Sequence, residues 1–134
     1  MSRAPSSTGR QVLVAVYAVF ALAAGARAIV QLLTKGDEAP LAYTLSLVAA
    51  VIYLVATLAL RRTTPRAHRV AFAACAFELV GVLAVGTLTV LDPELFPDET
   101  VWSTFGMGYG FVPLVLPVAG LWWLVRHPAV ADVR

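Results

Sequence analysis

Residues 70–91 read VAFAACAFELVGVLAVGTLTVL, an apolar run of about 22 residues that is long enough to cross a bilayer as one helix. Its one ionisable side chain other than the thiol of Cys75 is Glu78, close to the middle of the run. A charged side chain at that depth costs about 2.5–3.5 kcal/mol on insertion scales. We therefore expect Glu78 to face protein or water, to be paired, or to be protonated.

The composition around this run is that of a membrane protein rather than a soluble domain. Of 134 residues, 60% are hydrophobic and 13% are charged, and the mean hydropathy is +0.81. Cys75 is the only cysteine, which excludes an internal disulfide and a metal site built from cysteines. The sequence contains no HExxH, Walker or Ser/His/Asp motif. We therefore expect no catalytic residue, no metal, no cofactor and no nucleic-acid partner.

Three further apolar runs are long enough to span a bilayer. The sequence thus predicts an all-α bundle of four transmembrane helices in a single membrane domain, residues 12–126. The expected spans are residues 12–33, 41–60, 70–91 and 103–125. Residues 1–11 and 127–134 are predicted to be polar tails outside the membrane.

The charges of the connecting segments alternate in sign. Basic residues gather in the N-terminal tail, the second connection and the C-terminus, whereas the first and third connections hold Lys35 against six carboxylates. The positive-inside rule then places both termini in the cytoplasm of a multi-pass protein of the cell membrane. Trp122 and Trp123 near the inner end of the fourth span, and Trp102 near its outer end, fit the aromatic belts of membrane interfaces. His68 and His127 lie among the arginines at the inner boundary, where contact with solvent or lipid headgroups is expected.

The start of the chain is also compatible with a secretory signal peptide. Two arginines, an apolar core and small residues such as Ala24 and Ala26 follow in the order of such a signal. Hydrophobicity resumes beyond Arg27, which makes the run long enough to be a span. Cleavage would leave three spans in the same orientation, so the charges leave this alternative open.

A polar centre is expected around Glu78. Arg27 and Gln31 share one face of the first span, because they are four residues apart. Helix geometry puts Arg27 roughly 7 Å to the outer side of its span's midpoint and Glu78 roughly 4 Å to the inner side, with Tyr53 at the depth of Glu78. We therefore predict an Arg27–Glu78–Tyr53 cluster, closed directly or through a bridging water or hydroxyl. Whether Glu78 is ionised and paired with Arg27, or neutral, stays open.

Small residues and prolines predict the packing of the fourth span. Gly106 and Gly110 form a GxxxG pair, which allows close approach of two helices, and Gly25 offers a similar small surface on the first span. Pro113 and Pro117 predict a kink in the fourth helix. The glycines do not form a phosphate-binding loop, because no strand precedes them and no lysine follows.

Several stretches resemble a family of uncharacterised small four-span integral membrane proteins of high-GC Gram-positive bacteria. They are residues 24–33 (AGARAIVQLL), 38–43 (EAPLAY), 78–88 (ELVGVLAVGTL), 95–98 (LFPD) and 105–117, with FG at its start and YGFVPLVLP at its end. The resemblance implies the four-span topology and a bacterial membrane, and it implies no activity. Small multidrug resistance transporters also have four spans, but their intramembrane carboxylate is in the first span rather than the third.

Three classes of function remain open. The leading hypothesis is a structural or accessory membrane subunit that binds a membrane protein partner or a second copy of itself within the lipid bilayer. The first alternative is a small oligomeric transporter that uses Glu78 to carry protons or cations, and the second is a membrane enzyme acting on a lipid. An open cavity at Glu78 would favour transport, and a closed helix interface would favour the structural role.

Overall fold

All the regular structure of the described residues is helical. The computed structural model describes residues 5–35, 37–96 and 99–128, with the backbone alone for residues 5–7. Three helices are each long and apolar enough to cross a membrane, namely α1 (Pro5–Lys35), α2 (Pro40–Leu60) and α3 (Pro65–Leu91). The prediction of an all-α fold with several helices long and apolar enough to cross a membrane is confirmed at this level.

Prolines help to define where the helices begin. Pro40 and Pro65 stand in the first turns of α2 and α3, where the missing N–H of proline costs no helical hydrogen bond. The side chain of Thr64 caps α3 by accepting a hydrogen bond from the amide of Ala67 at 3.1 Å. The break between α2 and α3 is therefore encoded locally.

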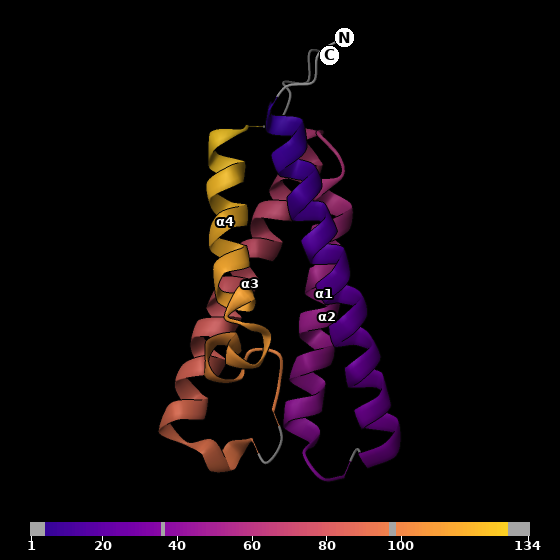
Figure 1. Cartoon of the computed structure of the whole chain (residues 1–134), viewed down its shortest axis with the longest axis vertical. Coiled ribbons are helices and arrows are strands. Elements are labelled where there is room, and N and C mark those ends of the chain that lie inside the picture. Colours follow the sequence, from indigo (N-terminus) through magenta and orange to yellow (C-terminus); the bar gives the residue numbers. More distant parts are fainter. Residues whose placement is uncertain (1–4, 36, 97–98, 129–134) are drawn as a thin grey trace.

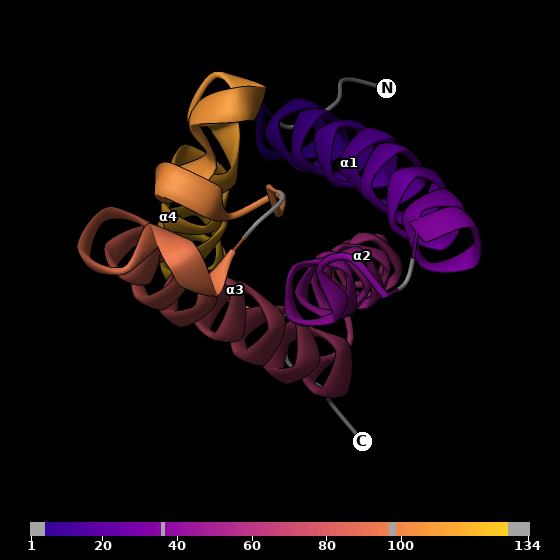
Figure 2. The same ribbon diagram turned by 90° about the horizontal axis from the view of Figure 1, so that it is seen from below.

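The long helices are arranged as an up-and-down bundle (Figures 1 and 2). α1 packs along α2, α2 packs against α3, and α3 packs against the last helix, α4 (Val112–Arg126). α1 begins and α4 ends at the same end of the bundle, where the connection between α2 and α3 also lies (Figure 1). The turn between α1 and α2 and the segment that follows α3 lie at the opposite end.

The fourth predicted span is not a single helix. Its first part is η2 (Ser103–Tyr109), a short 3₁₀ segment, and the axis of η2 is bent by 99° from that of α4. Residues in left-handed conformations interrupt the segment; they are Thr104, Phe105, Gly106, Gly110 and Phe111. An α-helix cannot continue through them, because left-handed residues point its carbonyls away from the helical hydrogen bonds. The described chain thus has three long helices and a broken fourth element, preceded by the short helix η1 (Pro93–Leu95).

The glycines and prolines of this element have structural roles that differ from the predicted ones. Gly106 and Gly110 adopt φ values of +82° and +65° and form the turn itself, rather than a GxxxG face on a regular helix. The 99° bend precedes both prolines. Pro113 lies in the first turn of α4, where it is accommodated, and only Pro117 lies inside the helix.

The ends of the membrane domain also differ from the expected bounds. α1 begins at Pro5 rather than at residue 12, so most of the predicted N-terminal tail continues the first helix. α4 ends at Arg126, as expected, and most of the predicted tail 127–134 lies outside the described residues.

Candidate functional site

Glu78 is the buried polar centre of the bundle. Its side chain is 0% exposed. Oε1 accepts a hydrogen bond from the hydroxyl of Tyr17 on α1 at 2.7 Å, and the same hydroxyl lies 3.3 Å from the Sγ of Cys75. Cys75 and Glu78 are three residues apart and so share one face of α3. The three side chains therefore link α1 to α3 through the interior.

The centre is closed on the side of α4. A Cβ atom added to Gly120 would lie 2.8 Å from the Sγ of Cys75 and 3.4 Å from the hydroxyl of Tyr17. Only a residue without a side chain allows α4 to approach this closely. Oε2 of Glu78 is enclosed without a hydrogen-bond partner among the described residues. One oxygen of the carboxyl group is thus satisfied and the other is not.

A second buried pair, Tyr53 and Trp102, lies beside the first. The indole Nε1 of Trp102 donates to the hydroxyl of Tyr53 at 2.9 Å, and the Tyr53 ring is 6.0 Å from the ring of Tyr17. Gly81 on α3 makes room for the indole, since a Cβ there would lie 2.6 Å from it. Trp102 was expected in an interfacial belt, but it is 2% exposed and belongs to the core.

Trp102 is held by an irregular segment whose backbone is satisfied by hydroxyl groups. The amide of Val101 donates to the Oγ of Ser46 on α2 at 3.3 Å, and the amide of Thr104 donates to the Oγ1 of Thr89 on α3 at 2.8 Å. Such backbone is tolerated at membrane depth only where protein, rather than lipid, surrounds it. We call residues 99–111 the re-entrant segment, because they fold back into the interior of the bundle before α4 runs on to the end where α1 begins.

Arg27 does not join the Glu78 centre. Its Nη1 donates to the hydroxyl of Tyr109 in the re-entrant segment at 3.0 Å, and its side chain is exposed. Along α1, Arg27 is ten residues beyond Tyr17, or about 15 Å. Among the described residues, Tyr17 is the hydrogen-bond donor to Glu78, and Tyr53 pairs with Trp102 instead. The predicted Arg27–Glu78–Tyr53 cluster is therefore divided into separate contacts.

The remaining predicted site residues lie away from this centre. Gln31 is 7% exposed, and its Oε1 has no hydrogen-bond partner among the described residues. Gly25 faces α2, where an added Cβ would lie 3.6 Å from the Cβ of Ala50, which is an ordinary packing distance. An alanine side chain would fit at position 25, so the contact between α1 and α2 there does not require a glycine.

The sequence reasoning missed four residues that build the centre. They are Tyr17, Gly81, Trp102 and Gly120. Tyr17 offered one signal, a hydroxyl within an otherwise apolar run. The glycines offered none, because their role depends on which large side chain faces each of them.

No protein family model matches the chain, and no curated protein or solved structure is similar to it. The described residues contain no group of three or more His, Cys, Asp or Glu side chains that could hold a metal ion. What the geometry offers is a single enclosed carboxyl group with one hydroxyl donor.

Replacing Tyr17 with phenylalanine is expected to lower the free energy of unfolding by about 1–2 kcal/mol, because both oxygens of Glu78 would then lack a partner. Thermal unfolding in detergent measures the change. Val19→Ala, at an exposed position on the same helix, is the control and should change stability little. Equal melting temperatures for Tyr17→Phe and the wild type would show that this hydrogen bond contributes nothing.

Proposed function

We propose that the protein is a multi-pass integral membrane protein of the bacterial cell membrane with a structural or accessory role. The observation that carries the proposal is the closed state of Glu78, which is 0% exposed and packed between α1, α3 and α4. A group that exchanges ions or substrate with water needs a path to it. An enclosed carboxyl group that bonds a neighbouring helix instead fixes the register of the two helices.

The distribution of charge supports an orientation with both termini in the cytoplasm. The end of the bundle where α1 begins and α4 ends carries arginines; they are Arg10, Arg61, Arg62, Arg66, Arg69 and Arg126. The described acidic side chains of the connections at the opposite end are Asp37, Glu38, Asp92, Glu94 and Glu99. The positive-inside rule places the arginine-rich end in the cytoplasm. The resemblance to small four-span proteins of high-GC Gram-positive bacteria agrees with this topology.

The native cysteine tests whether the centre is closed. Cys75 is 0% exposed and contacts the hydroxyl that bonds Glu78, so its thiol reports the access of water to the site. In native membranes we expect no labelling by a small charged methanethiosulfonate reagent, and full labelling after denaturation in SDS. A Cys75→Ala protein carrying Thr63→Cys, at an exposed position between α2 and α3, is the positive control. Labelling of Cys75 in the native membrane would contradict a closed structural centre.

An accessory role also predicts a partner. The tagged protein, extracted from its own membrane with a styrene–maleic acid copolymer at native expression level, should carry a stoichiometric membrane protein or a second copy of itself. Quantitative mass spectrometry and the mass of the particle distinguish these two cases. A monomer without a stoichiometric companion would argue against the accessory role.

A proton- or cation-coupled transporter is the second candidate function. It is supported by Oε2 of Glu78, a buried carboxyl oxygen without a hydrogen-bond partner among the described residues, since intramembrane acids of this kind carry protons in transporters. A pH-dependent flux in proteoliposomes that Glu78→Gln abolishes would establish this function. The structural role predicts no such flux in the wild type.

A further inference from the structure

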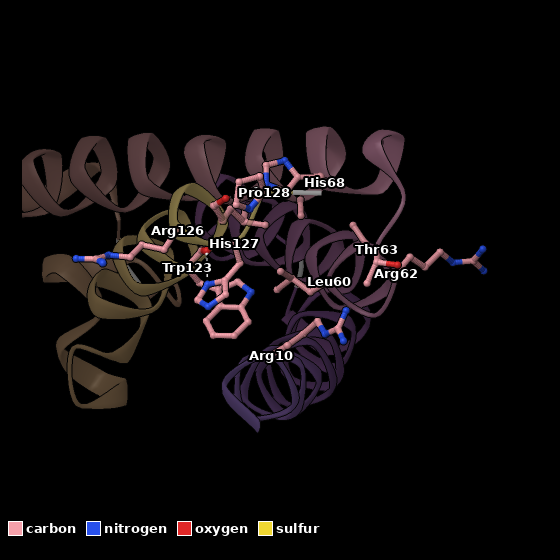
Figure 3. A pocket seen from close by; sticks show the side chains of 12 residues that line it. Arg10, Leu60, Arg62, Thr63, His68, Trp123, Arg126, His127 and Pro128 are labelled. Atoms are coloured by element: carbon pink, nitrogen blue, oxygen red, sulfur yellow. Dashed lines mark hydrogen bonds between the residues drawn. The ribbon is translucent and has the colours of Figure 1, made fainter. Parts of the chain in front are cut away.

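A cavity of about 390 Å³ lies at the arginine-rich end of the bundle, apart from the Glu78 centre (Figure 3). Residues from α1, α2, α3 and α4 line it: Arg10 of α1, Leu60 of α2, His68 of α3, and Trp123 and Leu124 of α4. Its position is therefore fixed by the packing of the bundle rather than by one loop. We name it the basic cavity.

The walls of the basic cavity are held in place by defined contacts. Nε2 of His68 donates to the backbone carbonyl of Leu124 at 2.9 Å, which joins α3 to α4 beside the cavity. The ring of His127 stacks on the indole of Trp123, with 3.7 Å between the ring centroids. Trp123 in turn packs directly against Gly9 of α1, where any Cβ would overlap the indole. The aromatic wall is thus positioned from two sides.

The ionisable side chains of the cavity are all basic. Arg10, Arg62, His68, Arg126 and His127 line it, and among the described residues no carboxylate does. Arg10 reaches across the α1 side toward Leu60, while Arg62 and Arg126 extend outward on opposite sides (Figure 3). Arg10 also borders a neighbouring hollow of about 340 Å³ together with Arg61. The excess of positive charge among the described lining residues favours an anion in the cavity.

Apart from Thr63, the rest of the lining is apolar. Basic and apolar surfaces in one cavity indicate a ligand that is both anionic and partly apolar. Leu60, Trp123 and Leu124 supply apolar surface to the cavity beside its basic side chains. Basic pockets between helices at the cytoplasmic face are suited to lipid headgroups, whose phosphate meets the arginines while the chains stay in the apolar region. We propose that the basic cavity binds a phosphate group, carried by an anionic phospholipid or present as free phosphate. This inference is independent of whether Glu78 has a structural or a transport role.

Native mass spectrometry of the full-length protein in detergent tests the proposal. The probes are phosphatidylglycerol and, with the same acyl chains, phosphatidylcholine. We expect retention of phosphatidylglycerol in preference to phosphatidylcholine. The double variant Arg10→Gln/Arg62→Gln should weaken binding of phosphatidylglycerol by about 30-fold, because it removes two arginine charges from the lining of the cavity near the membrane surface. Equal retention of the two lipids by the wild type, together with no stabilisation by phosphate, would overturn the proposal.

The matched control removes the same charge from the same end of the bundle. Arg66 and Arg69 are exposed on α3 and do not line the cavity, so Arg66→Gln/Arg69→Gln should weaken binding by less than about threefold. Equal losses in the two double variants would show a diffuse surface effect and overturn the site. If Arg10→Gln/Arg62→Gln does not fold, Arg62→Gln alone, at an exposed side chain, should still weaken binding by about fivefold.

A further arm separates the two sources of phosphate. Inorganic phosphate is added to lipid-free protein at constant ionic strength, with chloride as the comparison, and the melting temperature is measured. Stabilisation by phosphate that is lost in Arg10→Gln/Arg62→Gln identifies the free anion as a ligand. Selective retention of phosphatidylglycerol without this stabilisation identifies the lipid headgroup as the ligand.

Discussion

Replacing Trp102 with alanine is expected to lower the free energy of unfolding by about 3–5 kcal/mol, as is typical of truncating a large aromatic core residue. The indole is 2% exposed, fits against Gly81, and donates to the hydroxyl of Tyr53. Its removal leaves a cavity beside the Glu78 centre and deprives Tyr53 of its donor. It also removes the side chain that anchors the re-entrant segment.

Cys75 provides the measurement for this variant. Because it is the only cysteine and is buried, a dye that becomes fluorescent on reaction with thiols reports unfolding directly. Trp102→Ala should unfold at a much lower temperature than the wild type, and Trp102→Phe should lie between them because it keeps most of the volume. Trp122→Ala is the control, since that indole is 57% exposed and contacts Arg126 at the surface. Similar effects at positions 102 and 122 would contradict a buried anchor.

Replacing Glu78 with alanine is expected to cost about 2–4 kcal/mol, because it leaves a cavity and takes the acceptor away from the hydroxyl of Tyr17. Glu78→Gln should cost much less. The amide oxygen still accepts from Tyr17, and the amide nitrogen replaces an oxygen that already lacks a partner. Thermal unfolding of the three proteins in the same detergent gives the comparison.

The Glu78→Gln variant distinguishes the contribution of side-chain shape to stability from the contribution of the carboxyl group. If Glu78→Gln is as unstable as Glu78→Ala, the carboxyl group itself, and not its size and acceptor oxygen, stabilises the bundle. Glu94→Gln, at an exposed acid of the connection after α3, is the control for loss of one carboxylate and should leave stability unchanged.

The three long helices and the burial of Glu78 follow from features that are strong in the sequence. Each long apolar run has few charges, and prolines or polar clusters separate one run from the next. Glu78 lies near the middle of such a run, so a position inside the bundle that faces protein or water could be foreseen; the structure encloses it in protein. These features depend on local composition alone.

The broken fourth element could not be foreseen in the same way. Residues 103–125 are apolar enough for a span, and a GxxxG pair is equally compatible with a helix face and with a turn. The left-handed conformations of Thr104 and Phe105 are unusual for residues with side chains. They are held by tertiary contacts, such as the bond from the amide of Thr104 to Thr89, which no local pattern contains.

The partner of Glu78 was missed because a residue of opposite charge was preferred to a nearer hydroxyl. On the predicted bounds of the spans, Tyr17 lies within about 5 Å of the depth of Glu78, whereas Arg27 lies about 11 Å from it. The observed start of α1 at Pro5 moves the middle of this helix to Phe20, which leaves Tyr17 close to the depth of Glu78 and Arg27 further away. Depth alone therefore favoured Tyr17 over Arg27.

The contacts of the re-entrant segment also imply an order in which the helices of the bundle assemble. Its amide groups at Val101 and Thr104 find their acceptors on α2 and α3, and its indole on α2 as well. A newly made chain that entered the hydrocarbon before those helices stood side by side would expose bare peptide groups to lipid, at a cost of several kcal/mol for each. The part of the chain from residue 99 onward is therefore expected to stay at the water boundary until the earlier helices have formed the site that receives it.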